Sequence, residues 1–437
     1  MNYWLSYLFI VILTAEFTFQ ATPICGQVVE HEFIIGDPLP DAPVLALRGK
    51  YQIGVQTIDL LNKNQIDILN TKDGKEAFYD RPLKVEVWYP SSIDTTISPI
   101  INYEDVLGIA GNAERPLIPF SFLGRAMRDA KAISSEGAFP LVIVSHGYVG
   151  SRFLMTYLTE NLASKGFIVV AIDHTESTFS DAAGFQSTLL NRAKDILFVV
   201  DKFANLDAVG GNHFLSGKVD AENTAIIGYS MGGYGALNAA GAGYSEFALN
   251  FFKGMTGGST ALESRGTYSD EFKKSNDSRI KAVVAFAPWG MERGVWDEEG
   301  LKGLKVPTFF IAGSEDDISG YEKGIKAIYM GAVNADRYLL TYDNARHNVA
   351  PNPPQLATMK AGLHIDEYYR YAEPSWDERK INNINQHFIS AFLGTHLKGE
   401  DYNEYLSLPE DSNEKTWFGF IPRSSTGLSL LHAVPQE

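Results

Sequence analysis

Apolar side chains recur along this chain in two different patterns. Residues 51–61 and 81–90 alternate between polar and apolar positions, as half-buried strands do. From residue 140 onward, continuous apolar runs alternate with amphipathic segments of helical spacing. Apolar strands that alternate with helices are typical of a parallel sheet covered on both faces. The chain is therefore expected to be an α/β protein, with a mostly parallel central sheet, antiparallel N-terminal strands and helices on both faces.

Each segment of the second pattern predicts one element. Buried strands are expected at 140–147, 167–174, 225–227, 281–289, 306–317 and 337–347. Helices are expected at 151–166, 189–206, 231–240, 320–333 and 381–399. The tail 401–437 contains the apolar stretches WFGF and LSLLH, so it is expected to pack back on the domain.

Three long stretches lack these patterns and are expected to be insertions into a single domain over residues 46–437. They cover residues 91–138, 241–278 and 351–380. A helix is expected in the first insertion, around Phe122–Lys131. The second insertion carries Phe247, Phe251, Phe252 and Met255. This second insertion is expected either to cap the candidate site or to be a surface feature.

The N-terminus begins with an apolar run, Tyr3–Ala15, whose length matches the hydrophobic core of a signal peptide. Residues 1–26 are therefore predicted to be a signal peptide, and the protein is expected to be secreted or periplasmic. A membrane anchor is the alternative, because no Lys or Arg precedes the run. Residues 27–45, with several Pro and Asp residues, indicate a linker or an edge segment.

Composition narrows the class of protein further. The 437 residues are 45% hydrophobic and 12% aromatic, which favours a large packed core. The formal net charge of −16 argues against a nucleic-acid partner, since such proteins present a basic surface. No HExxH motif and no paired histidines at ligand spacing occur, so neither a metal nor a cofactor is expected. Oligomeric state is not predicted.

The stretch Gly228-Tyr229-Ser230-Met231-Gly232 has the pattern G-x-S-x-G, with an apolar strand before it and an Ala/Leu-rich helix after it. A serine on such a tight strand-to-helix turn needs small residues two positions to either side, because neighbouring backbone passes close by. The turn exposes the hydroxyl and directs the first amides of the helix toward an adjacent anion. Ser230 is therefore the candidate nucleophile. The alternative is a Gly/Ser-rich turn without chemical consequence.

Reactive groups also follow three other predicted strands, and ligands of such sheets lie at the carboxyl ends of strands. These segments are Ser145–Tyr148, Gly313–Asp317 and Asn344–Asn348. In the first, the backbone N–H of Tyr148 can join that of Met231 in an oxyanion hole, whereas the His146 side chain is expected to form local hydrogen bonds. The second supplies three consecutive acids, Glu315, Asp316 and Asp317, any one of which could orient a histidine. The third supplies His347 as the base. The order serine, acid, histidine along the chain is the one expected for such a sheet with a G-x-S-x-G turn.

The chain resembles serine α/β-hydrolases of the group that contains dienelactone hydrolase-like proteins, platelet-activating factor acetylhydrolases and polyester-degrading cutinases. The resemblance lies in VEVWYP, SHGY, VVAIDH, GYSMGG, AFAPW, VPTFFIAGSEDDIS and the RHN loop, and covers roughly residues 49–394. It implies an α/β-hydrolase fold, with the following roles. Ser230 is the nucleophile, His347 the base, Asp316 the acid, Tyr148 and Met231 the oxyanion amides, and Trp289 with Tyr148 the substrate-binding aromatics.

Two features depart from parts of this group. Dienelactone hydrolases proper use a cysteine where this chain has Ser230. The acetylhydrolases place their acid after the AFAPW-like strand, where this chain has Ala287, so the acid must come from the next strand. The three insertions also have no counterpart in the shorter cutinases.

The resemblance and the motifs together predict an enzyme, a serine hydrolase that cleaves carboxylic esters through an acyl-enzyme. Its expected substrate is a small-molecule or lipid-like ester with a short acyl, aryl or lipid-like group. The alternatives are an acyltransferase or a peptidase with the same triad, or a catalytically inactive binding module. Asp173 and His174 end a strand and are expected to be a structural loop.

Overall fold

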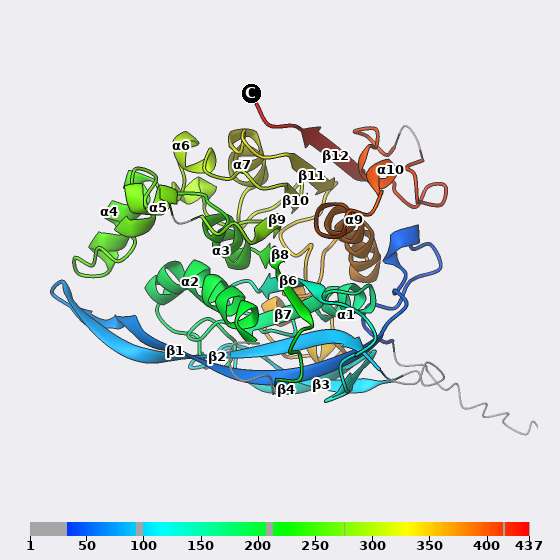
Figure 1. Cartoon of the computed structure of the whole chain (residues 1–437), viewed down its shortest axis with the longest axis horizontal. Coiled ribbons are helices and arrows are strands. Elements are labelled where there is room, and N and C mark those ends of the chain that lie inside the picture. Colours follow the sequence, from blue (N-terminus) through cyan, green and yellow to red (C-terminus); the bar gives the residue numbers. More distant parts are fainter. Residues whose placement is uncertain (1–32, 93–98, 207–212, 275, 414–415, 437) are drawn as a thin grey trace, which may run out of the picture. The chain divides into compact units, whose positions relative to one another are not determined.

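The computed structural model describes residues 33–92, 99–206, 213–274, 276–413 and 416–436. Within these ranges, ten strands form one sheet in the order β12-β11-β10-β9-β8-β6-β7-β2-β1-β5 (Figure 1). The strands are β1 (Gln52–Lys72), β2 (Lys75–Ser91), β5 (Ala126–Arg128), β6 (Phe139–Ser145), β7 (Ile168–Asp173), β8 (Val219–Tyr229), β9 (Ile280–Phe286), β10 (Thr308–Gly313), β11 (Arg337–Tyr342) and β12 (Leu428–Ala433).

The middle of this sheet is parallel, from β7 through β6, β8, β9 and β10 to β11. All residues of β6, β10 and β11 are buried, as expected for strands that helices cover on both faces. β2 runs antiparallel to β7, and β1 runs antiparallel to β2. The predicted fold class, a mostly parallel α/β-hydrolase sheet with antiparallel N-terminal strands, is confirmed.

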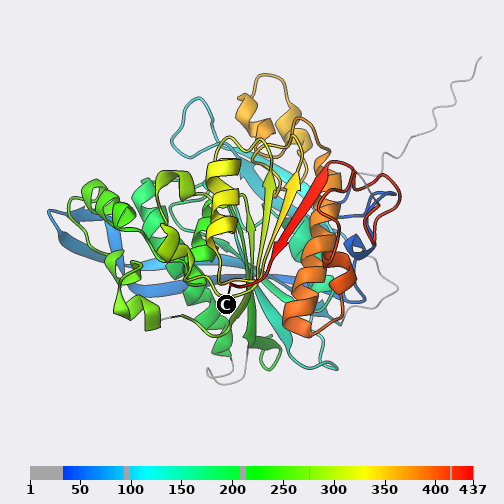
Figure 2. The ribbon, with the colours of Figure 1, turned by 90° about the horizontal axis from the view of Figure 1, so that it is seen from above.

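Helices lie on both faces of the sheet, with α1 packed on α9 on one face and α2 packed on α3 on the other (Figure 2). The helices are α1 (Thr156–Ser164), α2 (Phe185–Ala204), α3 (Met231–Ala239), α4 (Glu246–Met255), α5 (Asp270–Lys274), α6 (Glu298–Leu301), α7 (Lys326–Gly331), α8 (Ile365–Tyr369), α9 (Glu378–Lys398) and α10 (Asn403–Leu406). α9 begins three residues before the predicted start because the Asp377 side chain caps it, accepting the backbone N–H of Arg379.

The helix predicted around Phe122–Lys131 is wrong. This segment instead contains β5 and the end of β4 (Ile118–Gly124), which pairs antiparallel with β3 (Ile101–Leu107) in a separate small sheet. The Phe122 ring packs against Tyr103 with centroids 5.4 Å apart. A side chain at Gly124 would overlap Glu160 and Tyr103. Strand pairing and this close approach decide the conformation of a segment whose sequence has no strong period.

The three predicted insertions take different positions. The first contains β3, β4 and β5, the second contains α4 and α5, and the third contains α8. The first and third are joined by a partly buried ion pair between Arg115 and Glu367, whose atoms Nε and Oε1 lie 2.5 Å apart. The backbone N–H of Gly108 donates to Oε2 of the same Glu367 (2.9 Å).

The C-terminal tail packs on the domain, as predicted. β12 adds an antiparallel strand to β11 at the edge of the sheet, and Trp417 is buried. From Phe33 onward the described residues form one compact unit, in which Ile35 is buried and the backbone N–H of Leu39 donates to Asn383. The predicted signal peptide or anchor, residues 1–26, lies outside the described residues and stays a prediction, as do the domain boundaries.

Every helix within the described ranges is too short or too polar to cross a bilayer.

Candidate active site

Ser230 lies on a strained turn between β8 and α3, with φ of 54° and ψ of −112°. The flanking glycines make this turn sterically possible. A Cβ atom at Gly228 would overlap the backbone of Gly232, and one at Gly232 would overlap the carbonyl oxygen of Ser145. Only residues without a side chain fit both positions, which is the steric reason for the G-x-S-x-G spacing.

Ser230, His347 and Asp316 come together at the carboxyl ends of β8, β11 and β10. Nε2 of His347 lies 3.0 Å from Oγ of Ser230, and Nδ1 of His347 lies 2.8 Å from Oδ2 of Asp316. A carboxylate only accepts, so Nδ1–H donates to Asp316 and Nε2 is free to accept the serine proton. The three residues are 7%, 7% and 6% exposed, respectively, which limits solvent screening of these contacts.

Of the candidate acids, Asp316 contacts His347, whereas Asp317 points to Arg346 at the surface and is 43% exposed. Oδ1 of Asp316 accepts the backbone N–H groups of Ile318 (2.9 Å) and Ser319 (2.8 Å). Burial by itself raises the pKa of Asp316, but His347 and these two N–H groups outweigh burial and lower the pKa below its usual value. Asp316 is therefore ionised at neutral pH.

The turn after β6 lies directly beside Ser230. A Cβ atom at Gly147 would be 3.2 Å from the ring of Tyr229 and 3.4 Å from Cβ of Ser230. Tyr148 follows in this turn and lines the same cavity as Ser230 and His347. Met231 is the first residue of α3, where a backbone N–H has no acceptor within the helix. The two predicted oxyanion residues thus flank Ser230 on the β6 and β8 sides.

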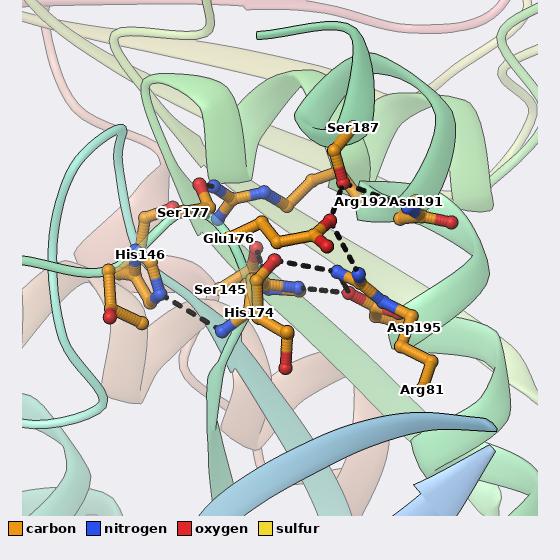
Figure 3. A network of polar contacts seen from close by, with 12 residues as sticks. Arg81, Ser145, His146, His174, Glu176, Ser177, Ser187, Asn191, Arg192 and Asp195 are labelled. Atoms are coloured by element: carbon orange, nitrogen blue, oxygen red, sulfur yellow. Dashed lines mark hydrogen bonds and ion pairs between the residues drawn. The ribbon is translucent and has the colours of Figure 1, made fainter. Parts of the chain in front are cut away.

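A buried polar network contacts the turn after β6 through His146 (Figure 3). Nη1 of Arg192 donates to the carbonyl oxygen of His146 (2.5 Å), and its other nitrogen donates to Ser177. The ring of His146 is buried, donates from Nδ1 to the Gly147 carbonyl (2.6 Å) and accepts the backbone N–H of His174 at Nε2 (3.3 Å). Its side chain therefore forms local hydrogen bonds, as expected from the sequence.

The same network contains a second Ser-His-Asp arrangement, which is fully buried (Figure 3). Ser145 Oγ lies 2.9 Å from Nε2 of His174, and Nδ1 of His174 lies 3.0 Å from Oδ2 of Asp195. Arg81 donates to both oxygens of Asp195, at 2.9 and 3.0 Å. Burial by itself raises the pKa of Asp195, but Arg81 and His174 together outweigh burial and lower the pKa to about 2. Ser145 is 0% exposed, so no substrate reaches it.

The cavity above Ser230 has a volume of about 520 Å³ and is closed on one side by the third insertion. Its lining includes Ile365, Asp366, Tyr369, Arg370, Ala372, Glu373 and Pro374 from that insertion. Arg370 donates to the carbonyl oxygen of Val149 (2.8 Å), next to the Tyr148 turn. Burial raises the pKa of Glu373, although the backbone N–H groups of Arg346 and Asn348 oppose this. The sequence analysis did not identify Arg370 or Glu373 as site residues, because no pattern in residues 351–380 relates them to the strands.

Trp289 follows β9, and its backbone N–H donates to the carbonyl oxygen of Ser230 (3.1 Å). Its ring does not meet that of Tyr148 directly. Phe185, at the start of α2, contacts both rings edge-to-face, with centroids 5.3 Å from Tyr148 and 5.4 Å from Trp289. Phe185 was not predicted as a site residue, since its position at a helix start carried no chemical signal.

Within the described ranges, no cluster of three or more His, Cys, Asp or Glu side chains is arranged to hold a metal ion.

The fold and the strand-end position of these residues match the α/β-hydrolase fold class. A solved ferulic acid esterase from Streptomyces cinnamoneus has the same fold, with a TM-score of 0.53 and 17% identity; the match covers 90% of this chain and 99% of that one. A family model described as "PETase: PET hydrolase-like" matches residues 131–247, which include Tyr148 and Ser230.

Sequence relatives point to one part of this class. The bis(hydroxyethyl) terephthalate hydrolase of Streptomyces coelicolor is 24% identical over 246 residues, which cover 55% of this chain and 62% of that protein. Cutinase est2 of Thermobifida alba is 26% identical over 247 residues, which cover 54% of this chain and 64% of that protein. The chain thus spans less than two thirds of the length of these relatives. The resemblance seen in the sequence is confirmed: the chain is similar to cutinase-like serine esterases of the α/β-hydrolase group.

Proposed function

We propose that this protein is a carboxylic ester hydrolase that works through an acyl-enzyme, with Ser230 as nucleophile, His347 as base and Asp316 as acid. The observation that carries the proposal is the continuous contact from Ser230 Oγ through His347 to Asp316 (3.0 and 2.8 Å) beside an open cavity. The similarity to cutinases and to a bis(hydroxyethyl) terephthalate hydrolase supports ester cleavage as the reaction.

In the proposed reaction, Ser230 Oγ attacks the ester carbonyl carbon while Nε2 of His347 takes the hydroxyl proton. The backbone N–H groups of Met231 and Tyr148 donate to the oxyanion that forms, and each such donor contributes about 10² or more to the rate. The tetrahedral intermediate collapses, and His347 passes the proton to the departing alcohol. A water molecule, deprotonated by His347, then attacks the acyl-serine, and the bond to Ser230 Oγ breaks as His347 returns the proton to that oxygen and the acid leaves.

The proposed substrate is a small-molecule or lipid-like ester with a short acyl, aryl or lipid-like group, and no cofactor takes part. Export through residues 1–26 to a secreted or periplasmic location belongs to the same proposal. The cavity lining carries two cationic side chains, Arg346 and Arg370, beside three acidic ones, Asp317, Asp366 and Glu373, so it offers no excess of positive charge to an anionic substrate.

The test is hydrolysis of p-nitrophenyl acetate by the full chain and by its Ser230→Ala variant. We expect turnover that falls by about 10⁴-fold or more in the variant, and labelling of Ser230 by a fluorophosphonate probe. An acyltransferase would pass the acyl group to an added alcohol in preference to water. Absence of both turnover and labelling would contradict the hydrolase and favour a binding module.

A further inference from the structure

A second cavity lies next to the candidate active site, between α4 and the strand-end loop that carries Trp289. Its volume is about 600 Å³. Its lining is almost entirely apolar and aromatic, and consists of Phe185, Leu189, Tyr234, Tyr244, Phe247, Ala248, Phe251, Phe252, Met255, Leu262, Trp289, Glu292, Arg293, Gly294 and Val295. Most of one wall comes from α4, which belongs to the second insertion.

The wall formed by α4 is held in place by specific contacts. Ser245 caps the helix by accepting the backbone N–H of Ala248 (3.1 Å), and its hydroxyl donates to the Gly294 carbonyl (2.6 Å). The backbone N–H of Ser245 donates to the carbonyl oxygen of Val295 (2.9 Å). A Cβ atom at Gly294 would lie 2.8 Å from the ring of Phe247, so this ring fits here because residue 294 has no side chain. The cavity is therefore a formed part of the fold.

Aromatic rings connect the two cavities. Tyr148 lines the cavity of Ser230, whereas Phe185 and Trp289 line the second cavity. The ring of Phe185 contacts those of Tyr148 and Trp289, and the backbone of Trp289 contacts that of Ser230. These rings lie between the two cavities, so an extended ligand with its carbonyl at Ser230 would have to pass along their edges to enter the second cavity.

The chemistry of the second cavity favours an occupant without polar groups. The Tyr234 hydroxyl donates to the Leu189 carbonyl (2.8 Å) and shares a hydrogen bond with the Tyr244 hydroxyl (2.8 Å), so both hydroxyls have partners within the protein. Only Glu292 and Arg293 carry charge in the lining. Phe247 and Phe251 stack on each other but remain 63% and 58% exposed, which leaves apolar surface for a ligand to cover.

We propose that this cavity is a second subsite, which binds the hydrocarbon chain of a lipid-like ester whose carbonyl lies at Ser230. The chain belongs to the acyl or to the alcohol side of the ester, and the experiment below distinguishes the two. The proposal rests on the proposed esterase function and adds a substrate class to it. Burying each methylene group contributes about fourfold to kcat/KM, as long as the chain still extends into the cavity.

The experiment measures kcat/KM for two series of esters below their aggregation concentrations. One series lengthens the acyl chain (p-nitrophenyl acetate, butyrate, octanoate, decanoate), and the other lengthens the alcohol (butyl, octyl and decyl acetate). We expect kcat/KM to rise with length in one series. Ala248→Phe fills the cavity and is expected to abolish this rise while acetate hydrolysis continues. Phe251→Ala, which removes a wall residue without filling space, is expected to reduce the rise.

Phe418→Ala is the matched control, because Phe418 is also an exposed phenylalanine but contacts Tyr405 at α10 and lines neither cavity. It is expected to leave both series unchanged. Binding is followed independently of turnover in the Ser230→Ala variant, through quenching of tryptophan fluorescence by bromododecanol. This binding is expected to saturate, and to weaken at least tenfold when Ala248→Phe is added.

The two proposals fail in different ways. If acetate hydrolysis occurs but length dependence is absent, or is the same in wild type and in Ala248→Phe, the hydrocarbon subsite is refuted and the esterase proposal stands. If acetate is not hydrolysed but bromododecanol binds and Ala248→Phe weakens its binding, the esterase proposal fails while the apolar site stands.

Discussion

Glu373 accepts the backbone N–H of Asn348 with an N–O distance of 2.6 Å. Its other oxygen accepts the backbone N–H of Arg346, also at 2.6 Å. One carboxylate of the third insertion therefore holds both residues that flank His347. The Asn348 side chain in turn accepts a hydrogen bond from Tyr229 (2.7 Å), the residue before Ser230. The insertion thus fixes the loop that carries His347, the proposed base, relative to the end of β8, which precedes Ser230, the proposed nucleophile.

Loss of this carboxylate is expected to lower kcat. Glu373→Ala frees the His347 loop, and a displacement of the base by about 1 Å reduces kcat by about 10²-fold with little change in KM. Glu373→Gln keeps one acceptor oxygen and is expected to recover part of the loss. The measurement is kcat and KM with p-nitrophenyl acetate, beside circular dichroism to establish folding. Glu322→Ala is the control, because Glu322 is an exposed acid in the short helical turn Tyr321–Ile325 and forms an ion pair with Lys326. An unchanged kcat in Glu373→Ala would show that the loop keeps its position without this residue.

The two neighbouring acids are expected to respond differently to removal of charge. Asp316→Asn leaves His347 in place but no longer favours the tautomer with Nδ1–H, and kcat is expected to fall by about 10⁴-fold. Asp317→Asn loses only a surface ion pair with Arg346 and is expected to keep the wild-type kcat. Steady-state kinetics of the two variants show which of the two acids supports His347. Equal losses, or a larger loss in Asp317→Asn, would reassign the acid.

The buried Ser145-His174-Asp195 arrangement is expected to serve stability and not turnover. Ser145→Ala removes the hydroxyl that donates to Nε2 of His174 (2.9 Å) and leaves a buried acceptor without a partner. The free energy of unfolding is expected to fall by about 1–3 kcal/mol while kcat is retained. Ser230→Ala is the matched variant and is expected to show the opposite: lost turnover and retained stability. Loss of turnover in a folded Ser145→Ala variant would contradict this separation.

Two buried histidines are expected to make stability depend on pH. Burial lowers the pKa of His174 and of His387 to about 3 each, so both are neutral in the folded protein. In the unfolded chain their pKa is about 6.5. Between about pH 6.5 and about pH 3 the unfolded state therefore binds more protons, and the free energy of unfolding falls as pH decreases, by up to about 1.4 kcal/mol per histidine and pH unit.

Urea unfolding between about pH 7 and about pH 4 measures this slope. His387→Asn removes one titrating group, and its amide oxygen can replace Nδ1 as the acceptor of the Leu45 backbone N–H (3.1 Å). The slope contributed by the two histidines is expected to halve in this variant. A slope identical to that of the wild type would mean that His387 does not remain neutral in the folded protein.

Local steric and hydrophobic rules were sufficient for much of this protein. The G-x-S-x-G turn could be predicted because the requirement for glycine at 228 and 232 comes from backbone that passes within the same turn or directly next to it. Strands that are buried on both faces are continuous apolar runs in the sequence, so the parallel strands were also predicted. The helix expected at Phe122–Lys131 failed because pairing with β3, and not local preference, determines the conformation there.

The sequence by itself determined most of the strands and helices and the tight G-x-S-x-G turn at Ser230, because each depends on neighbours along the chain. Residue patterns left Asp316 and Asp317 open and the resemblance implied Asp316; the tertiary structure adds that Asp316 contacts His347 whereas Asp317 contacts Arg346, since adjacent side chains in a loop point in different directions. It also decided that Glu373 supports the His347 loop and that α4 encloses an apolar cavity beside Trp289. These contacts join residues far apart in sequence, and their geometry follows from the packing of the insertions, for which the hydrophobic pattern carries no information.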